Sequence, residues 1–185
     1  MRPDGRAGIG RMAKPVRKDE TYRFRAVEDE DLPLLESWLG QPHWTQWWGS
    51  PTVALAEIRA AMESIDTEPL IVELNGRPIA YLQSYDPHLE DDHPYADQPF
   101  GTLGVDLSIG PVEMLGKGHG SAMLRQFTEQ LFAEGAPRVV IDPDPANLRA
   151  IRAYTKAGFR SIEERDTASE RVLLMARDDE QVDIA

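Results

Sequence analysis

The hydrophobic residues of this chain recur at two different spacings, and each spacing predicts a different kind of secondary structure. Apolar and polar residues alternate in several short runs, which is typical of strands. Apolar residues three and four positions apart, as in Met123, Phe127 and Leu131, predict helices. Strands are therefore expected at Tyr22–Val27, Pro69–Leu74, Pro78–Tyr85, Leu103–Ile109, Arg138–Ile141, Phe159–Glu164 and Arg171–Ala176.

Capping residues place the helices between these strands. The first helix begins at Asp29 or Asp31 and runs through Leu39, the second is capped by Thr52, the third follows a glycine-rich stretch, and the fourth spans Pro145–Ala157. Between the first two helices, the segment 43–49 holds three of the four tryptophans and shows no clear element.

The order of these elements predicts the fold class. Asn75-Gly76 joins two strands as a hairpin turn, and this hairpin precedes the glycine-rich stretch. That order excludes a doubly wound parallel sheet. We therefore expect an α+β fold, a mixed central sheet of six to seven strands with flanking helices. One domain at residues 21–178 would follow a flexible N-terminal extension at 1–20 and precede a tail at 179–185.

The stretch Leu115–Leu124 combines closely spaced glycines with the start of a helix. Three glycines alternate over five positions, at Gly116, Gly118 and Gly120. Glycine tolerates positive φ and lets the backbone approach a ligand closely. The first turn of the following helix leaves N–H groups unpaired and carries the positive end of the helix dipole. This combination predicts a site for phosphate oxygens.

Two common nucleotide-binding motifs do not fit this stretch. A P-loop has Gly-Lys followed by Ser or Thr, whereas Lys117 is followed by Gly118. A dinucleotide-binding motif follows the first strand of its domain, whereas several predicted strands precede this one. On these residues alone, a flexible turn that merely starts a helix remains an alternative.

Together with a downstream segment, this stretch resembles the GNAT superfamily of acyl-CoA-dependent N-acetyltransferases. The downstream part is Asp142-Pro143 and the run Asn-Leu-Arg-Ala-Ile-Arg-Ala-Tyr-Thr-Lys-Ala-Gly-Phe from Asn147 to Phe159. The resemblance implies the GNAT fold, acetyl-CoA as the cofactor, and a glycine loop around the coenzyme A pyrophosphate. One position departs from the family pattern: three residues before the central glycine, Gly118, the family usually carries Gln or Arg, whereas this chain has Leu115. The cofactor-binding residues implied are Leu115, Gly116, Lys117, Gly118, His119, Gly120, Ser121, Asn147 and Lys156.

Within the superfamily, the sequence is similar to the aminoglycoside 6'-N-acetyltransferases. The shared segments are Trp47-Trp48-Gly49, Gln83-Ser84-Tyr85 and Gly104-Val105-Asp106, in that order. By this resemblance, Asp106 holds or deprotonates the 6'-amine, and Tyr154 protonates the departing thiolate. The substrate-binding residues implied are Trp47, Trp48, Gln83, Tyr85, Asp106 and Asp142.

Each of these residues also has a purely structural interpretation. Asp106 faces one side of a predicted strand, where a solvated carboxylate is common. Tyr154 in an amphipathic helix is often a packing residue, and Asp142 often starts a turn. Trp47 and Trp48 serve either as core anchors or as flat walls for sugar rings and ammonium groups.

Composition narrows the choice of partners. The formal net charge of −12 disfavours nucleic acid, whose phosphates would be repelled, and favours a cationic small-molecule amine. Locally the balance reverses, because the basic residues Lys117, Arg125, Arg149, Arg152 and Lys156 cluster around the proposed coenzyme A segments. No apolar run approaches the roughly twenty residues of a membrane span, so no membrane partner is expected. A chain without cysteine suits the cytoplasm, where we expect a monomer or weak homodimer.

No metal site is expected, because the spacing of His88 and His93 around an acidic run matches no metal-binding motif.

The sequence leaves three candidate functions. The first is an aminoglycoside-type N-acetyltransferase that uses acetyl-CoA. The second is a GNAT enzyme for another amine, such as a siderophore lysine derivative or a protein N-terminus. The third is a non-catalytic acyl-CoA-binding module.

Overall fold

The computed structural model describes residues 21–180, so the expected extension at 1–20 and most of the expected tail lie outside the described residues. The strands are β1 (Tyr22–Ala26), β2 (Thr67–Leu74), β3 (Arg77–Tyr85), β4 (Leu103–Ile109), β5 (Arg138–Ile141), β6 (Arg160–Asp166) and β7 (Arg171–Asp178). The helices are α1 (Leu32–Leu39), α2 (Pro42–Trp48), α3 (Pro51–Glu63), α4 (His119–Ala133) and α5 (Leu148–Lys156).

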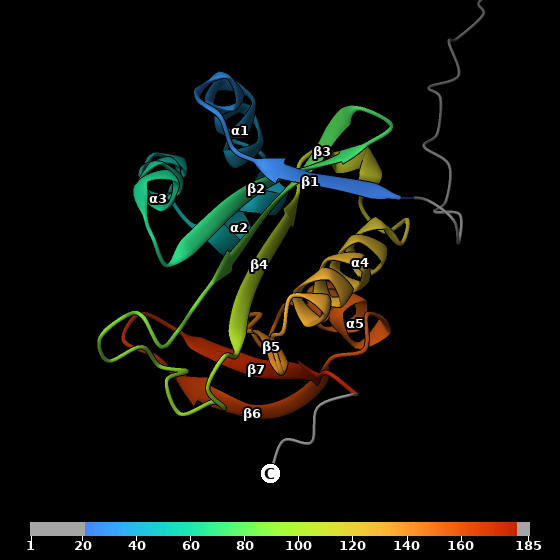
Figure 1. Cartoon of the computed structure of the whole chain (residues 1–185). Helices are drawn as coiled ribbons and strands as arrows, with labels where there is room; N and C mark the ends of the chain where they lie inside the picture. Colours follow the sequence, from blue (N-terminus) through green and yellow to red (C-terminus); the bar gives the residue numbers. More distant parts are fainter. Residues whose placement is uncertain (1–20, 181–185) are drawn as a thin grey trace, which may run out of the picture.

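The strands form one mixed sheet in the order β1-β2-β3-β4-β5-β7-β6, which confirms the expected α+β fold with flanking helices. Among the strands of residues 21–180, only β4 and β5 pair in parallel, and they pair at Leu103 with Val139 and at Gly104 with Val140. Beyond these pairs the two strands separate toward their carboxyl ends (Figure 1). This opening positions the candidate site.

Helices cover both faces of the sheet. One core cluster packs residues of α4 and α5 against the sheet, and another packs α1, α2 and α3 against the opposite face (Figure 1). Strand β2 shows the consequence, because Leu70 and Val72 belong to the first cluster and Ile71 to the second. Two covered faces explain why this strand is apolar in succession rather than strictly alternating. Within residues 21–180, no helix has the length and apolar character needed to cross a membrane.

Helix α2 is the element that the pattern did not predict. Pro42 occupies its first turn, and Trp44, Trp47 and Trp48 recur at helical spacing. The Trp44 side chain is fully buried, and its Nε1 donates a hydrogen bond of 2.8 Å to the Ile109 carbonyl oxygen. Trp44 therefore anchors α2 against the end of β4, and this contact leaves Trp47 and Trp48 only partly buried.

The start of α1 agrees with the sequence, because Asp31, at the end of a short 3-10 turn, is the residue before the helix. Two other helix starts differ from those expected. Ser50 rather than Thr52 is the residue before α3. Helix α5 begins at Leu148 rather than Pro145, because the Asn147 carboxamide oxygen accepts a hydrogen bond of 3.1 Å from the Ala150 N–H and so caps the helix.

Ion pairs hold the start of α1 against the sheet. The Arg25 guanidinium on β1 donates to both carboxylate oxygens of Asp31 at 2.6 and 2.8 Å, and to Glu73 on β2 at 2.8 Å. Both carboxylate residues are buried, and the hydrogen bonds from Arg25 lower the pKa of Asp31. The helical arm α1–α2, which carries Trp47, is thereby fixed relative to β1 and β2.

Candidate active site

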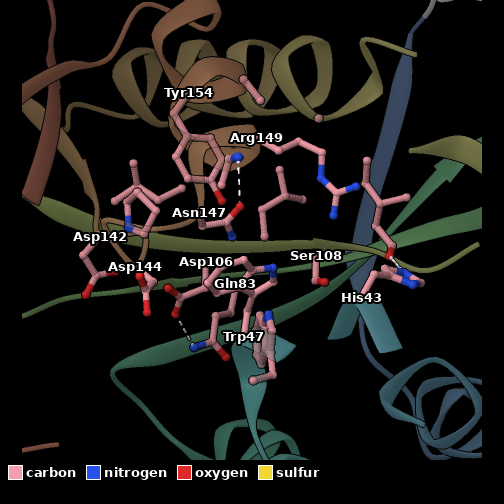
Figure 2. Close-up of a pocket in the computed structure, with 18 of the residues that line it drawn as sticks. His43, Trp47, Gln83, Asp106, Ser108, Asp142, Asp144, Asn147, Arg149 and Tyr154 are labelled. Atoms are coloured by element: carbon pink, nitrogen blue, oxygen red, sulfur yellow. Dashed lines mark hydrogen bonds between the residues drawn. The ribbon is translucent and has the colours of Figure 1, made fainter. Parts of the chain in front are cut away.

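A cavity of about 1020 Å³ opens where β4 and β5 separate. Its walls include β3, β4, α2 and part of the loop 86–102 on one side, and the glycine loop and α5 on the other. Figure 2 shows Asp106 and Gln83 between Tyr154 on the α5 side and Trp47 on the α2 side. This volume lies at the upper end of the range for small-molecule sites, so it has room for more than one ligand.

The lining of the cavity separates by charge. Acidic lining residues are Glu57, Asp66, Asp86, Glu90, Asp106, Asp142, Asp144 and Glu170. Basic lining residues are Arg149, Arg152 and Lys156, all on α5. The α5 side therefore suits an anionic ligand, and the remaining walls suit a cationic one.

Asp106 lies on β4 directly opposite Gln83 in the β3–β4 ladder. The Gln83 Nε2 donates a hydrogen bond of 2.7 Å to Asp106 Oδ2, and the Tyr81 hydroxyl donates one of 2.7 Å to Gln83 Oε1. Tyr81 thus orients the carboxamide so that its NH₂ group faces the carboxylate. Burial raises the pKa of Asp106 to about 6, and the Gln83 hydrogen bond opposes part of that rise.

Asp142 follows the end of β5 and also lines the cavity. Its Oδ2 accepts a hydrogen bond from the Tyr95 hydroxyl. Burial and then the charge of Asp106 raise the pKa of Asp142 to about 7, while the bond from Tyr95 lowers it. The two carboxyl groups are linked electrostatically, so they titrate as a pair rather than independently.

Tyr154 lies on α5 and is buried, with 8% of its surface exposed. Burial, followed by the charges of Asp106 and Asp142, raises the pKa of its hydroxyl well above the usual value. The hydroxyl therefore stays protonated at neutral pH and is available as a hydrogen-bond or proton donor. Tyr154 therefore combines a packed position with a protonated hydroxyl group in the cavity lining.

The glycine loop leads directly into α4. Gly116 and Gly118 adopt φ values of 70° and 90°, which side chains other than glycine rarely adopt. No side chain caps the N-terminus of α4, so its first N–H groups are available to a ligand. The predicted cofactor residues that line the cavity are Leu115, Gly116, Gly118, Gly120, Ser121, Asn147 and Lys156.

Two predicted cofactor residues do not line the cavity. The His119 side chain is 2% exposed, and its Nδ1 lies 2.9 Å from the Tyr22 hydroxyl on β1. The structure therefore places this imidazole in the core, because its position in the first turn of α4 points it toward the sheet. Lys117 is also absent from the lining, which leaves the cationic role to the residues of α5.

All the predicted substrate residues, by contrast, line the cavity: Trp47, Trp48, Gln83, Tyr85, Asp106 and Asp142. Sequence reasoning missed Tyr81, Tyr95 and Glu170, because each reaches the site from a position that no motif marks. It also missed His43, whose Nε2 lies 2.9 Å from the Ile109 carbonyl oxygen. Within residues 21–180, no group of three His or acidic side chains is arranged to hold a metal.

The separated β4 and β5 strands, with the uncapped glycine loop beside them, border one cavity that has a basic side on α5 and several acidic walls. Residues 27–167 match the family model described as an acetyltransferase (GNAT) domain, so the chain belongs to the GNAT acetyltransferase family.

The proteins to which this chain is similar include aminoglycoside acetyltransferases. The chain is 33% identical over 161 residues to an aminoglycoside N(6')-acetyltransferase type 1 from Klebsiella pneumoniae, covering 82% of this chain and 80% of that relative. A crystal structure of an aminoglycoside acetyltransferase in complex with coenzyme A and kanamycin superposes with a TM-score of 0.77 at 32% identity, covering 85% of this chain and 95% of that one. The same enzyme in complex with paromomycin and acetyl-CoA gives a TM-score of 0.78 at 30% identity, covering 86% and 94%.

Proposed function

We propose that this protein transfers the acetyl group of acetyl-CoA to a primary amine of a polycationic small molecule, namely the 6'-amine of an aminoglycoside. The observation that carries this proposal is the charge separation within one cavity. A glycine loop and three α5 cations line the side suited to coenzyme A, while eight carboxylates line the remainder. Asp106 lies on β4, the strand that borders the opening between the two sides.

The α5 side of the cavity fits the phosphates of coenzyme A. Uncapped N–H groups at the start of α4 are donors to pyrophosphate oxygens, and Arg149, Arg152 and Lys156 supply positive charge. Ser121 lines the same region, with its hydroxyl donating at 3.0 Å to the Gly118 carbonyl oxygen. Asn147 is our candidate for supporting the pantetheine arm, because it caps α5 and also lines the cavity.

Two side chains carry the proton transfers. Asp106 accepts a proton from the ammonium form of the substrate, since a carboxylate with a pKa near 6 is ionised and moderately basic at neutral pH. Acetyl-CoA supplies the acetyl group as a thioester, whose carbon–sulfur bond breaks as the amine forms the new carbon–nitrogen bond. Tyr154 donates its hydroxyl proton to the leaving sulfur and regains one as the nitrogen loses its second proton, so one proton is released overall.

The carboxylate-rich side fits a substrate with several ammonium groups on a rigid frame. Asp142, Asp144 and Glu170 provide charge at one edge of the cavity, and Trp47 and Tyr85 provide flat surfaces. A monoamine would leave most of these carboxylates without a cation in a partly desolvated site. This is why we favour an aminoglycoside over a simpler amine.

A matched pair of aminoglycosides tests the proposal. Neamine carries a 6'-amine, and paromamine has a 6'-hydroxyl in its place with the remaining amines unchanged. We expect acetyl-CoA-dependent release of coenzyme A with neamine and little or none with paromamine. Lysine-type amines and short peptides are assayed in parallel as alternative substrates. Preferential turnover of either of these would assign the protein to another GNAT substrate class, and equal turnover of neamine and paromamine would exclude the 6'-amine.

A cytoplasmic place of action follows from this proposal, because the cysteine-free chain suits a reducing compartment in which acetyl-CoA is available. Resistance to aminoglycosides would then be a consequence of the reaction. Expression in a susceptible bacterium should raise the inhibitory concentration of an aminoglycoside that has a 6'-amine. The same expression should leave the inhibitory concentration of a 6'-hydroxyl analogue unchanged.

A further inference from the structure

Tyr95 connects the loop between β3 and β4 to Asp142, on the other side of the opening between β4 and β5. Its hydroxyl donates a hydrogen bond to Asp142 Oδ2, and only 1% of the residue's surface is exposed. Asp142 lines the cavity, whereas Tyr95 does not. The tyrosine therefore approaches the carboxylate from behind, on the side away from the ligand.

Contacts outside the cavity fix the ring of Tyr95. The Arg165 guanidinium on β6 lies 5.6 Å from the ring centroid, and it donates hydrogen bonds of 3.0 and 2.9 Å to the two carboxylate oxygens of Asp97. The Tyr95 N–H donates to His93 Nδ1 at 3.0 Å, and the two rings pack with centroids 5.2 Å apart. The loop thus presents the Tyr95 hydroxyl from a fixed position.

Several ionisable groups surround Asp142. The neighbouring groups from other elements are Asp106 on β4, Glu170 between β6 and β7, Tyr154 on α5, Tyr85 on β3 and Tyr95 on the loop. The two acidic neighbours disfavour the charged form of Asp142, whereas the hydrogen bond from Tyr95 favours it. The hydrogen bond from Tyr95 thus opposes part of the rise in the pKa of Asp142 and orients its carboxyl group.

We propose that Tyr95 is a positioning residue that holds Oδ2 of Asp142, so that the other oxygen faces the cavity and accepts one ammonium group of the substrate. This inference rests on the proposed function, in which Asp142 binds a cationic substrate. It gives the loop between β3 and β4 a role in substrate specificity, because a change in that loop would reposition a carboxylate that the loop itself does not contain.

The variant Tyr95→Phe tests this role because it keeps the ring and removes only the hydroxyl. Without that donor, the charged form of Asp142 is less favoured, so its pKa should rise by about one unit. An NMR titration of ¹³C-labelled aspartate in the protein without substrate measures this shift directly. The acid limb of kcat/KM for neamine should move to higher pH by a similar amount, with a raised KM at neutral pH.

Two further variants separate positioning from a general structural effect. Tyr22→Phe removes another buried, hydrogen-bonded tyrosine hydroxyl and should leave the Asp142 titration unchanged. In the double variant Tyr95→Phe with Asp142→Asn, loss of the hydroxyl should have little further effect on KM, because the group it positions is gone. Additive effects on KM would indicate a structural role and overturn the proposal.

The readouts also distinguish this inference from the proposed function. An unchanged Asp142 pKa in Tyr95→Phe overturns the positioning role, whatever the substrate. A shifted pKa in a protein that does not acetylate neamine supports the link between Tyr95 and Asp142 and rejects the aminoglycoside.

Discussion

Asp106 and Asp142 occupy equivalent positions on neighbouring chain segments, each two residues beyond the last parallel pair, Gly104 with Val140. Parallel strands that separate at this point bring two carboxyl groups to the same opening. Each has one oxygen held by a neutral donor, Gln83 for Asp106 and Tyr95 for Asp142. Burial raises the pKa of both groups, so a bound cation would favour their ionised forms.

The variant Asp106→Asn should lose most of its activity. It removes a charge-assisted contact to the ammonium, about 1.5–3 kcal/mol, and also the proposed base. We expect kcat/KM for neamine to fall by at least about 100-fold. Asp91→Asn is a matched control, because Asp91 is exposed on the loop between β3 and β4 and does not line the cavity. Full activity in Asp106→Asn would remove this residue from the mechanism.

Activity should depend on pH through the carboxylate pair. With pKa values of about 6 for Asp106 and about 7 for Asp142, both groups become protonated as the pH falls below this range. Neutral carboxyl groups neither attract the ammonium nor accept its proton. The value of kcat/KM, measured at constant ionic strength, should therefore decline between about pH 7 and pH 5. A profile that stays flat down to pH 5 would contradict the assignment.

Tyr154→Phe should lower kcat with little change in the KM for the amine, because a leaving-group acid acts mainly in the transition state. A loss of about 10²–10⁴-fold is typical of general acid catalysis. Steady-state kinetics with neamine as the varied substrate measure both constants. Wild-type kcat in this variant would assign the proton to water, and an increase confined to KM would assign Tyr154 to binding.

The buried carboxylate of Asp106 should lower the free energy of unfolding at high pH. The pKa of Asp106 is higher in the folded state than the usual value, so its contribution favours folding at pH 4 and diminishes as the pH rises through about 6. Asp106→Asn should therefore raise the free energy of unfolding by about 2–3 kcal/mol at pH 8. The gain should disappear near pH 4. Urea unfolding at the two pH values checks this, and equal effects at both would show that burial does not raise this pKa.

Much of the fold could be predicted from the sequence because its signals are local. Alternating or continuously apolar runs located the seven strands of residues 21–180, and Asn75-Gly76 marked the hairpin between β2 and β3. Helix α2 was missed because the helix is short and its tryptophans divide between core and cavity. Spacing from Trp44 to Trp47 and Trp48, after Pro42, was the available signal.

The candidate site was predictable only where a motif marks it. The glycine loop and the run after Asp142 identified most of the cavity lining near α5. Tyr81, Tyr95 and Glu170 were not predictable, because their proximity depends on the strand register and on the path of a long loop. The burial of His119 is also a tertiary effect, since it depends on Tyr22 from the other end of the domain.

The position of the acetyl group on the product tests the central claim most directly. Neamine has several primary amines, and the cavity must bring one of them to the thioester of acetyl-CoA. Two-dimensional NMR of the product formed from neamine and acetyl-CoA should show a single acetamide, at the 6' nitrogen. Acetylation at another nitrogen, a mixture of positions, or no product would contradict the arrangement of Asp106 and the coenzyme A loop proposed for this site.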